Sequence, residues 1–467
     1  MTRPLTRRNF IAHTARFGLT GLALPAFLAA CTVRTAQPTA PPISATAATW
    51  TALVAPTLRA TTTTSIAAGE RPPIIFVHGN SNVSSLWHTT IWRYESNGWP
   101  RDRLFAVDFP YPTARDDDSV AQASRSGSDE QRGQLLAVVD SIIARTGAAK
   151  VVLIGSSRGG NAIRNLLKNG GGTPRVSHAI LCGTPNHGAY VRTGDRNEFN
   201  GAGPFLQGLN AGSEVAPNVA FLTTRSDRND LYAQPGGGGY DGPTLAGATN
   251  IVLPGVDHNE TATSAQAFAA IGQFLTGQPL SAQIAPEGTV ELNGRVTGFD
   301  GTTPTNLAVS GVAVTIYALD PPTGERHGDA QHRQTTDTSG IWGPCVTRPD
   351  TYLEFVVAAP GQPARHFFRS PFPRSSAYVG LRLWPDTAIA DQGVVVFTRP
   401  RGYVAGGRDT ALLDGKPVPG LKTGLPTEGT FRIPFPGPER AIPAALNGET
   451  MIVRSIPGAI SYAEFHY

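Results

Sequence analysis

The sequence predicts a mostly parallel β-sheet with helices on both faces, followed by an all-β sandwich or barrel region. Between about residues 73 and 276, short apolar runs alternate with stretches whose apolar residues recur at helical spacing. After Pro279, runs of β-branched and aromatic residues recur between Gly, Pro and Asp, without a long amphipathic helix. A chain of 467 residues with 52 Gly and 39 Pro has room for both parts and for their turns.

The first part is expected to form one domain over residues 71–279. In chain order it holds strands at residues 74–77 and 104–108, a helix at 131–146, a strand at 151–154, a helix-like stretch at 161–168, and strands at 179–182, 220–224 and 251–253. The strand segments are mostly apolar, as in parallel strands that are buried on both faces of a sheet. Their alternation with helices is typical of βαβ units and predicts that the strands run parallel.

The second part is expected to be all β, with one sandwich domain over residues 286–385. Its strand-like segments lie at residues 290–299, 309–319, 352–358, 366–368, 378–384, 393–398, 429–435, 450–455 and 461–467. Their β-branched and aromatic residues suit a half-buried pleated surface. Residues 386–467 are either a second β domain or a continuation of the same barrel.

The N-terminus has the features of an export signal. Arg7 and Arg8 precede an apolar run at residues 17–30 that contains proline and glycine and is short for a transmembrane helix. Paired arginines ahead of a short apolar run are typical of twin-arginine signals. We therefore expect residues 1–30 to direct export through the twin-arginine route.

The apolar run ends in Leu28-Ala29-Ala30-Cys31. This motif is similar to the lipobox of bacterial lipoproteins, and that resemblance implies lipid attachment at Cys31. An ordinary cleaved signal is the alternative. Residues 31–70, rich at first in Thr, Ala and Pro, are expected to be a flexible tether. The protein is then a membrane-anchored lipoprotein, or a periplasmic or extracellular protein.

Charge and cysteine content exclude two classes of protein. Of the 39 Lys and Arg residues, four lie in residues 1–30; none of the 35 Asp and Glu residues does, so the rest of the chain is formally neutral. Such a chain lacks the charge excess of a nucleic-acid-binding surface. Three cysteines are too few for a disulfide framework or a Cys-rich metal site. Cys182 and Cys345 either form a disulfide or remain buried thiols.

The strongest motif is Gly155-Ser156-Ser157-Arg158-Gly159, which lies directly after a predicted strand and before a helix-like stretch. A G-x-S-x-G sequence in this context indicates a nucleophile elbow, a sharp turn that exposes the serine hydroxyl above the end of the sheet. Ser157 is therefore the candidate nucleophile.

A serine hydroxyl needs a base to accept its proton, and the base needs an acid to orient it. His258 follows the strand at 251–253 and has the expected chain order after the serine, whereas His187 comes before every candidate acid. Two carboxylates after the strand at 220–224, Asp227 and Asp230, compete for the role of the acid.

The tetrahedral intermediate of acyl transfer needs two hydrogen-bond donors for its oxyanion. The backbone N–H of Arg158, which follows the nucleophile, is the first candidate. The second is the backbone N–H of Asn80 in His78-Gly79-Asn80, a loop that leaves the first predicted strand. We expect His78 to brace this loop rather than to transfer protons.

These motifs resemble the α/β-hydrolase fold and, within it, bacterial lipases and esterases similar to the class 2 lipases. The resemblance also includes Gly183-Thr184-Pro185-Asn186-His187-Gly188 and the loop at 254–258. It favours Asp230 as the acid, since a D-x-x-x-x-P stretch begins there as in several lipases. Two positions depart from the family pattern. Ser156 stands where lipases often have His, and Arg158 stands where Met or Gln is common.

The C-terminal part has a looser resemblance, to the β-barrel attached to an archaeal secreted lipase, carried by residues 293–296 and 365–374. In that family this part helps to bind long acyl chains. The sequence as a whole predicts a cofactor-free and metal-free serine hydrolase of uncharged carboxylic esters, a carboxylesterase or triacylglycerol lipase. The alternatives are a polyester depolymerase and a non-catalytic surface protein on a hydrolase scaffold. The long segment at 189–218 is either a lid or a surface excursion.

Overall fold

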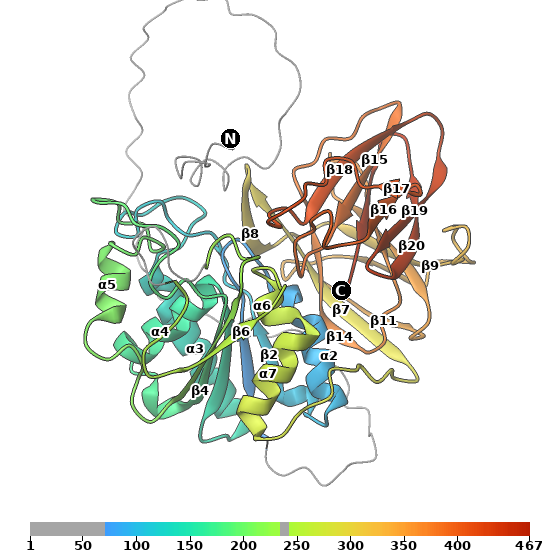
Figure 1. Ribbon diagram of the computed structural model, residues 1–467. Helices are drawn as coiled ribbons and strands as arrows, with labels where there is room; N and C mark the ends of the chain where they lie inside the picture. The colour runs from blue at the N-terminus through green and yellow to red at the C-terminus, as the bar shows by residue number, and fades with distance from the viewer. Residues whose placement is uncertain (1–70, 234–241) are drawn as a thin grey trace, which may run out of the picture. The chain divides into compact units, whose positions relative to one another are not determined.

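The first part of the chain forms a six-stranded parallel sheet in the computed structural model, which describes residues 71–233 and 242–467 (Figure 1). Its strands are β1 (Ile74–Val77), β2 (Leu104–Val107), β3 (Val151–Ser156), β4 (Val176–Cys182), β5 (Ala220–Ser226) and β6 (Thr249–Leu253). Their order across the sheet is β2-β1-β3-β4-β5-β6, and every neighbouring pair is parallel. The expected signal at 1–30, Cys31 and the tether at 31–70 lie outside the described residues.

Helices cover both faces of this sheet. They are α2 (His88–Ser96), α3 (Ser128–Thr146), α4 (Arg158–Asn169), α5 (Pro204–Asn210), α6 (Glu260–Thr263) and α7 (Ala265–Thr276), with short 3-10 turns η2 (Ser84–Trp87), η3 (Arg101–Arg103) and η4 (Thr173–Arg175). Helices α3 and α4 pack on the face that presents Ile75 and Leu153. Helices α2 and α7 pack on the opposite face, which presents Phe76 and Ile154 (Figure 1). This arrangement confirms the predicted α/β-hydrolase fold.

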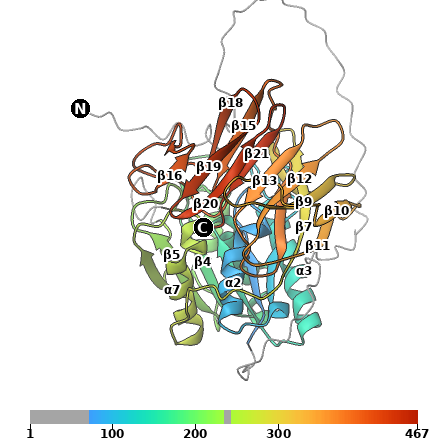
Figure 2. The same cartoon turned by 90° about the vertical axis from the view of Figure 1, so that its right-hand side faces the viewer.

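The C-terminal part is all β, as predicted. Its strands are β7 (Val290–Asp300), β8 (Thr303–Ala308), β9 (Ala313–Leu319), β10 (His332–Thr335), β11 (Ile341–Thr347), β12 (Tyr352–Ala358), β13 (Arg365–Arg369), β14 (Ser376–Arg382), β15 (Gln392–Thr398), β16 (Ala411–Leu413), β17 (Lys416–Pro417), β18 (Thr430–Pro436), β19 (Arg440–Leu446), β20 (Glu449–Ser455) and β21 (Ile460–Glu464). The largest sheet has seven strands in the order β10-β9-β12-β13-β21-β15-β18 (Figure 2). Strands from both sides of residue 385 therefore share one sheet.

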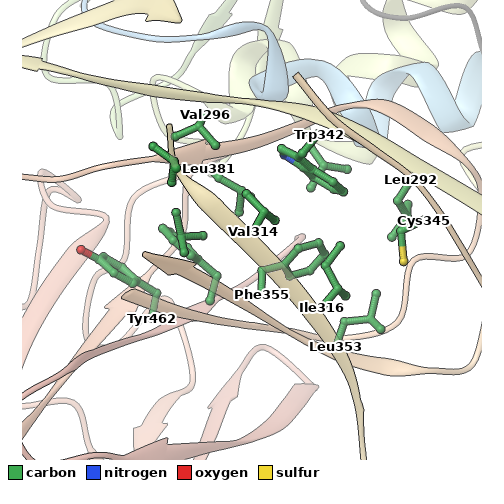
Figure 3. Close-up of a cluster of buried hydrophobic side chains, with 14 of the residues drawn as sticks. Leu292, Val296, Val314, Ile316, Trp342, Cys345, Leu353, Phe355, Leu381 and Tyr462 are labelled. Atoms are coloured by element: carbon green, nitrogen blue, oxygen red, sulfur yellow. The ribbon is translucent and has the colours of Figure 1, made fainter. Parts of the chain in front are cut away.

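Smaller sheets cover both faces of the seven-stranded sheet. On one face, Phe355 and Tyr462 pack against Trp342 and Leu381 of the sheet formed by β11, β7 and β14 (Figure 3). On the other face, a second core includes side chains from the sheet β17-β16-β19-β20. The alternating side chains of the central strands thus contribute to two cores. Cys182 and Cys345 are buried free thiols.

The β region packs directly on the hydrolase sheet. Trp92 of α2 belongs to the core shared by β7, β12 and β14, and the hydroxyl of Tyr378 on β14 accepts a hydrogen bond from the backbone N–H of Ala106 on β2 at 3.0 Å. Ion pairs strengthen this contact, because Glu95 of α2 accepts from Arg374 at 2.9 Å. No helix within the described ranges has the length and apolar character needed to span a membrane.

Candidate active site

The backbone turns sharply at Ser157, between β3 and α4. Ser157 has φ 54° and ψ −119°, a strained conformation for a residue with a side chain. A Cβ added at Gly159 would lie 2.3 Å from the carbonyl oxygen of Val77 at the end of β1. The second glycine of the motif is thus required by the close approach of α4 to β1. The geometry is that of a nucleophile elbow.

His258 follows β6 and is buried against a carboxylate. Its Nδ1 lies 2.9 Å from both carboxylate oxygens of Asp230. Asp230 is fully buried and also accepts hydrogen bonds from the backbone N–H groups of Tyr232 at 2.8 Å and Ala233 at 2.9 Å. These donors hold the carboxylate in position, so that Nδ1–H of His258 donates to it and Nε2 is left to accept a proton.

The two other candidates have different partners. A carboxylate oxygen of Asp227 accepts from the backbone N–H of Arg228 at 2.7 Å and of Gly255 at 3.1 Å, so this residue stabilises the turn. The ring of His187 is bound to Glu214, at 2.7 Å. Of the two possible acids, the structure therefore places Asp230 against His258.

The end of β4 brings Ser157 and His258 close together. The backbone N–H of Ser157 donates to the carbonyl of Cys182 at 2.8 Å. The next residue, Gly183, has φ +55°, and a Cβ added there would lie 3.3 Å from Nδ1 of His258. The elbow and the histidine loop thus meet at this turn, which only glycine adopts without strain.

Buried charges near His258 change its pKa. Burial alone would lower its pKa, but the charge of Asp230, the hydrogen bond to it and the charge of Asp257 outweigh this effect and raise the pKa above 6.5. The ring of Tyr232 packs 4.9 Å from the imidazole ring, measured between centroids. An imidazole with a raised pKa is a stronger base, which suits the removal of a proton from a hydroxyl.

The predicted oxyanion loop lies beside the elbow. A Cβ added at Gly79 would be only 3.1 Å from the Cβ of Ser157. The side chain of Asn80 accepts from the backbone N–H of Ala114 at 2.8 Å, which fixes the residue whose N–H was predicted as a donor. The other predicted donor, the N–H of Arg158, belongs to the first residue of α4, where no intrahelical acceptor exists.

His78 braces the oxyanion loop. Its Nδ1 bonds to the carbonyl of Gly79 at 2.8 Å, and its Nε2 accepts from the backbone N–H of Phe109 at 3.2 Å. Burial lowers the pKa of His78 to about 4, although the charge of Asp108 opposes this effect. The ring is therefore neutral at physiological pH and holds the loop by hydrogen bonds.

The side chain of Arg158 joins the elbow to two neighbouring segments. It donates to the carbonyls of Pro112 at 2.9 Å and Ser126 at 2.6 Å, and it forms a buried ion pair with Glu198. Burial raises the pKa of Glu198 to about 7 despite the opposing charge of Arg158. The elbow motif marks Arg158 in the sequence, whereas the only sequence signal for Glu198 is an acid within the long segment at 189–218.

Within the described ranges, no group of three or more His, Cys, Asp or Glu side chains is arranged to hold a metal ion. The fold is that of an α/β hydrolase, and the candidate site lies at the carboxyl ends of its parallel strands, where the elbow at Ser157 lies near the buried pair of His258 and Asp230.

Comparisons with known proteins show that this chain is similar to lipases. Residues 71–181 match the family described as lipase (class 2), and residues 288–384 match the family described as lipase C-terminal domain. The triacylglycerol lipase of Vibrio cholerae serotype O1 is 49% identical over 95 residues, 20% of this chain and 27% of that protein. The chain thus covers about a quarter of the length of this curated relative. These matches confirm the predicted resemblance to lipases and esterases in both parts of the chain.

Solved structures with a similar fold include further lipases. The mature form of Bacillus licheniformis lipase BlEst2 is 20% identical, covers 45% of this chain and 92% of its own, and has a TM-score of 0.32. Aspergillus fumigatus lipase B is 15% identical, covers 45% of this chain and 54% of its own, and has a TM-score of 0.36.

Proposed function

We propose that the protein hydrolyses carboxylic esters through a triad of Ser157, His258 and Asp230. The observation that carries this proposal is the buried hydrogen-bonded pair of His258 and Asp230, which lies beside a strained serine at a nucleophile elbow. The matches to two lipase families support the same reaction.

The reaction has two stages. Ser157 Oγ attacks the carbonyl carbon of the ester while Nε2 of His258 accepts the hydroxyl proton, and Asp230 stabilises the resulting imidazolium. The negative charge that develops on the carbonyl oxygen is bound by the backbone N–H groups of Asn80 and Arg158. When the intermediate collapses, His258 returns the proton to the leaving alcohol. Water, activated by the same imidazole, then attacks the acyl-enzyme and releases the acid.

We further propose that the substrate is an uncharged lipid ester. The chain after residue 30 is formally neutral, so that neither anionic nor cationic substrates are attracted by net charge. A carboxylesterase and a triacylglycerol lipase differ in the acyl chain length of the esters that they prefer. A series of nitrophenyl esters from acetate to palmitate, compared with emulsified triacylglycerol, separates them.

The test of the triad compares two adjacent serines. Ser157→Ala should lower kcat/KM for a nitrophenyl ester by at least about 10³-fold, because loss of the nucleophile removes the acyl-enzyme route. Ser156→Ala is the matched control and should keep wild-type activity. A fluorophosphonate probe should label the wild type and the control but not Ser157→Ala. Retained turnover or labelling in Ser157→Ala, with native circular dichroism, would refute the assignment.

The N-terminal sequence supports a proposal on location. We propose that the chain is exported by the twin-arginine route and anchored to a membrane by lipid on Cys31. Mass spectrometry of the mature N-terminus tests this. A chain that begins at Cys31 with added acyl mass is expected, and an unmodified N-terminus at another residue would exclude the anchor.

A further inference from the structure

A loop of the β region packs on the loop that carries His258. It comprises residues 399–409, directly after β15, and is called the arginine loop here because Arg399, Arg401 and Arg408 all point into the contact. The carbonyl of Arg401 accepts a hydrogen bond from Thr263 Oγ1 of α6 at 2.8 Å. The guanidinium of Arg401 donates to the carbonyl of Ser85 in η2 at 3.0 Å. The arginine loop therefore touches both the histidine side and the oxyanion side of the site.

The main contact is a cluster of two carboxylates and two arginines beside His258, and Asp409 also binds Arg408 at 2.8 Å. Asp257 directly precedes the histidine and is fully buried, and Glu260 follows it by two residues. Arg408 lies 3.2 Å from Asp257 and 2.9 Å from Glu260. Arg399 lies 3.5 Å from Asp257 and 2.5 Å from Glu260. Each arginine thus binds both carboxylates.

The two carboxylates also shape the backbone around the histidine. Asp257 accepts a hydrogen bond from the backbone N–H of Glu260 at 3.0 Å, and Glu260 accepts one from the N–H of Asp257 at 2.8 Å. The second oxygen of Asp257 accepts from the N–H of Tyr403 at 2.6 Å, and the carbonyl of Tyr403 accepts from both arginines. The conformation of the turn that presents His258 therefore depends on these carboxylates being held in place.

We propose that Arg408, together with Arg399, is a positioning residue of the active site, which holds Asp257 and Glu260 and balances their charge so that His258 faces Asp230. This inference rests on the proposed ester hydrolysis. It gives the C-terminal β region an indirect part in catalysis, because the arginines reach the histidine loop across about 140 residues of sequence.

The charges around His258 determine whether its pKa rises or falls in each variant. The charged or titratable groups that face His258 or its flanking carboxylates are Asp230, Tyr232, Asp257, Glu260, Arg399, Tyr403 and Arg408. Burial and Glu260 raise the pKa of Asp257 to about 7, and the two arginines oppose this rise. Loss of the positive charge of Arg408 lets the pKa of Asp257 rise further, so that Asp257 is neutral over more of the pH range and raises the pKa of His258 less. Loss of the negative charge of Asp257 also lowers the pKa of His258.

The experiment measures kcat and KM of the full-length protein from pH 5 to 9 with a short-chain nitrophenyl ester. Arg408→Gln should lower kcat about 10-fold or more with KM changed by less than about 3-fold, and should move the acid limb of kcat/KM to lower pH. Arg408→Lys keeps the charge and should restore much of the rate and the position of the limb. The matched control is Arg440→Gln, which removes an exposed pair with Asp414 in the same region and should leave the profile unchanged.

Asp257→Asn is a nearly isosteric second variant. It should move the acid limb to lower pH, in the same direction as Arg408→Gln, and it keeps the test decisive where Arg408→Gln folds poorly. Profiles of Arg408→Gln and Asp257→Asn that coincide with that of Arg440→Gln would overturn the inference. Failure of the underlying function is distinguishable, since the wild type would then hydrolyse the ester no faster than Ser157→Ala.

Discussion

Replacement of Arg158 by Met, an uncharged side chain of similar length, isolates the effect of its buried ion pair. Both partners are almost completely buried, with side chains 1% and 2% exposed. Removal of one partner leaves an uncompensated buried charge, which costs about 3–5 kcal/mol in comparable cases. The loss of the hydrogen bonds to Pro112 and Ser126 adds to this cost. We therefore expect Arg158→Met to lower the free energy of unfolding by at least about 3 kcal/mol at pH 8.

The pH dependence gives the prediction a second signature. The folded-state pKa of Glu198 is already raised to about 7, against an ordinary value of 4.5, so this group destabilises the fold as pH rises from 4.5 to 7. Without Arg158 the pKa of Glu198 rises further. The unfolding free energy of the variant therefore continues to fall above pH 7, where that of the wild type no longer changes with the ionisation of Glu198. The difference in unfolding free energy between the two proteins should grow by about 1.4 kcal/mol per pH unit above pH 7.

Urea denaturation followed by tryptophan fluorescence at pH 6, 7, 8 and 9 measures both effects. The double variant Arg158→Met/Glu198→Leu removes the unpaired charge and should recover part of the loss. Arg175→Met removes the exposed pair with Asp140 and should cost less than about 1 kcal/mol. An unfolding free energy of Arg158→Met within about 1 kcal/mol of the wild type at pH 8, or a difference that stays constant from pH 7 to 9, would contradict this prediction.

Two further predictions concern the same region. The acid limb of kcat/KM for a neutral ester should have its midpoint above pH 6.5, because His258 must lose a proton to act as a base and its pKa is raised; a midpoint below pH 6 in a pH–rate profile would contradict this. Gly159→Ala places a Cβ 2.3 Å from the carbonyl oxygen of Val77 and should destabilise the fold by about 1–3 kcal/mol. Gly133→Ala, on the exposed face of α3 with nothing within 4 Å, should stabilise it by about 0.5–1 kcal/mol. If the urea midpoints of Gly159→Ala and Gly133→Ala shift in the same direction, the steric explanation is refuted.

The parallel sheet and the elbow were predictable because their signals are local. An apolar strand, a G-x-S-x-G turn and a helix follow one another within about 20 residues, and the structure places β3, Ser157 and α4 there. The choice between Asp227 and Asp230 as the acid that orients His258 does not depend on local sequence. It depends on which carboxylate of one loop turns towards His258, and Asp227 instead binds the backbone of Gly255.

Six strands of the β region, β8, β10, β11, β16, β17 and β19, lie outside the predicted segments, and the physical reason is plain for β11 and β19. Strand β11 contains Gly343 and Pro344, and β19 contains Pro443 among alanines, and these residues disfavour a strand when read alone. Their pairing with β7, β16 and β20 supplies the hydrogen bonds and burial that override this preference. The arginine loop was missed because its partners lie more than 130 residues away, and no spacing in the sequence marks such a contact.

The oxyanion loop is held from the β region in a similar way, and this contact leads to a last prediction. Asn306 of β8 donates to the carbonyls of Asn82 and Phe109, both at 3.0 Å, and its side-chain oxygen accepts from Arg382. Arg382 in turn donates to the carbonyl of Ser81 at 3.1 Å, a residue with φ 60°. The chain directly after Asn80 is thus fixed by two side chains of the β region.

Asn306→Ala removes this support and leaves four polar partners without their bond to Asn306, since its side chain also contacts Nε2 of His78 at 3.4 Å. The backbone N–H of Asn80 should then be less well aligned with the oxyanion, an effect on the transition state rather than on substrate binding. Since complete loss of such a donor costs about 10²–10³-fold in kcat, we expect a reduction of about 10–100-fold with KM nearly unchanged. Leu307→Ala, the exposed neighbour on β8, is the matched control. Equal kcat values for the two variants would mean that the oxyanion loop holds its geometry without the β region.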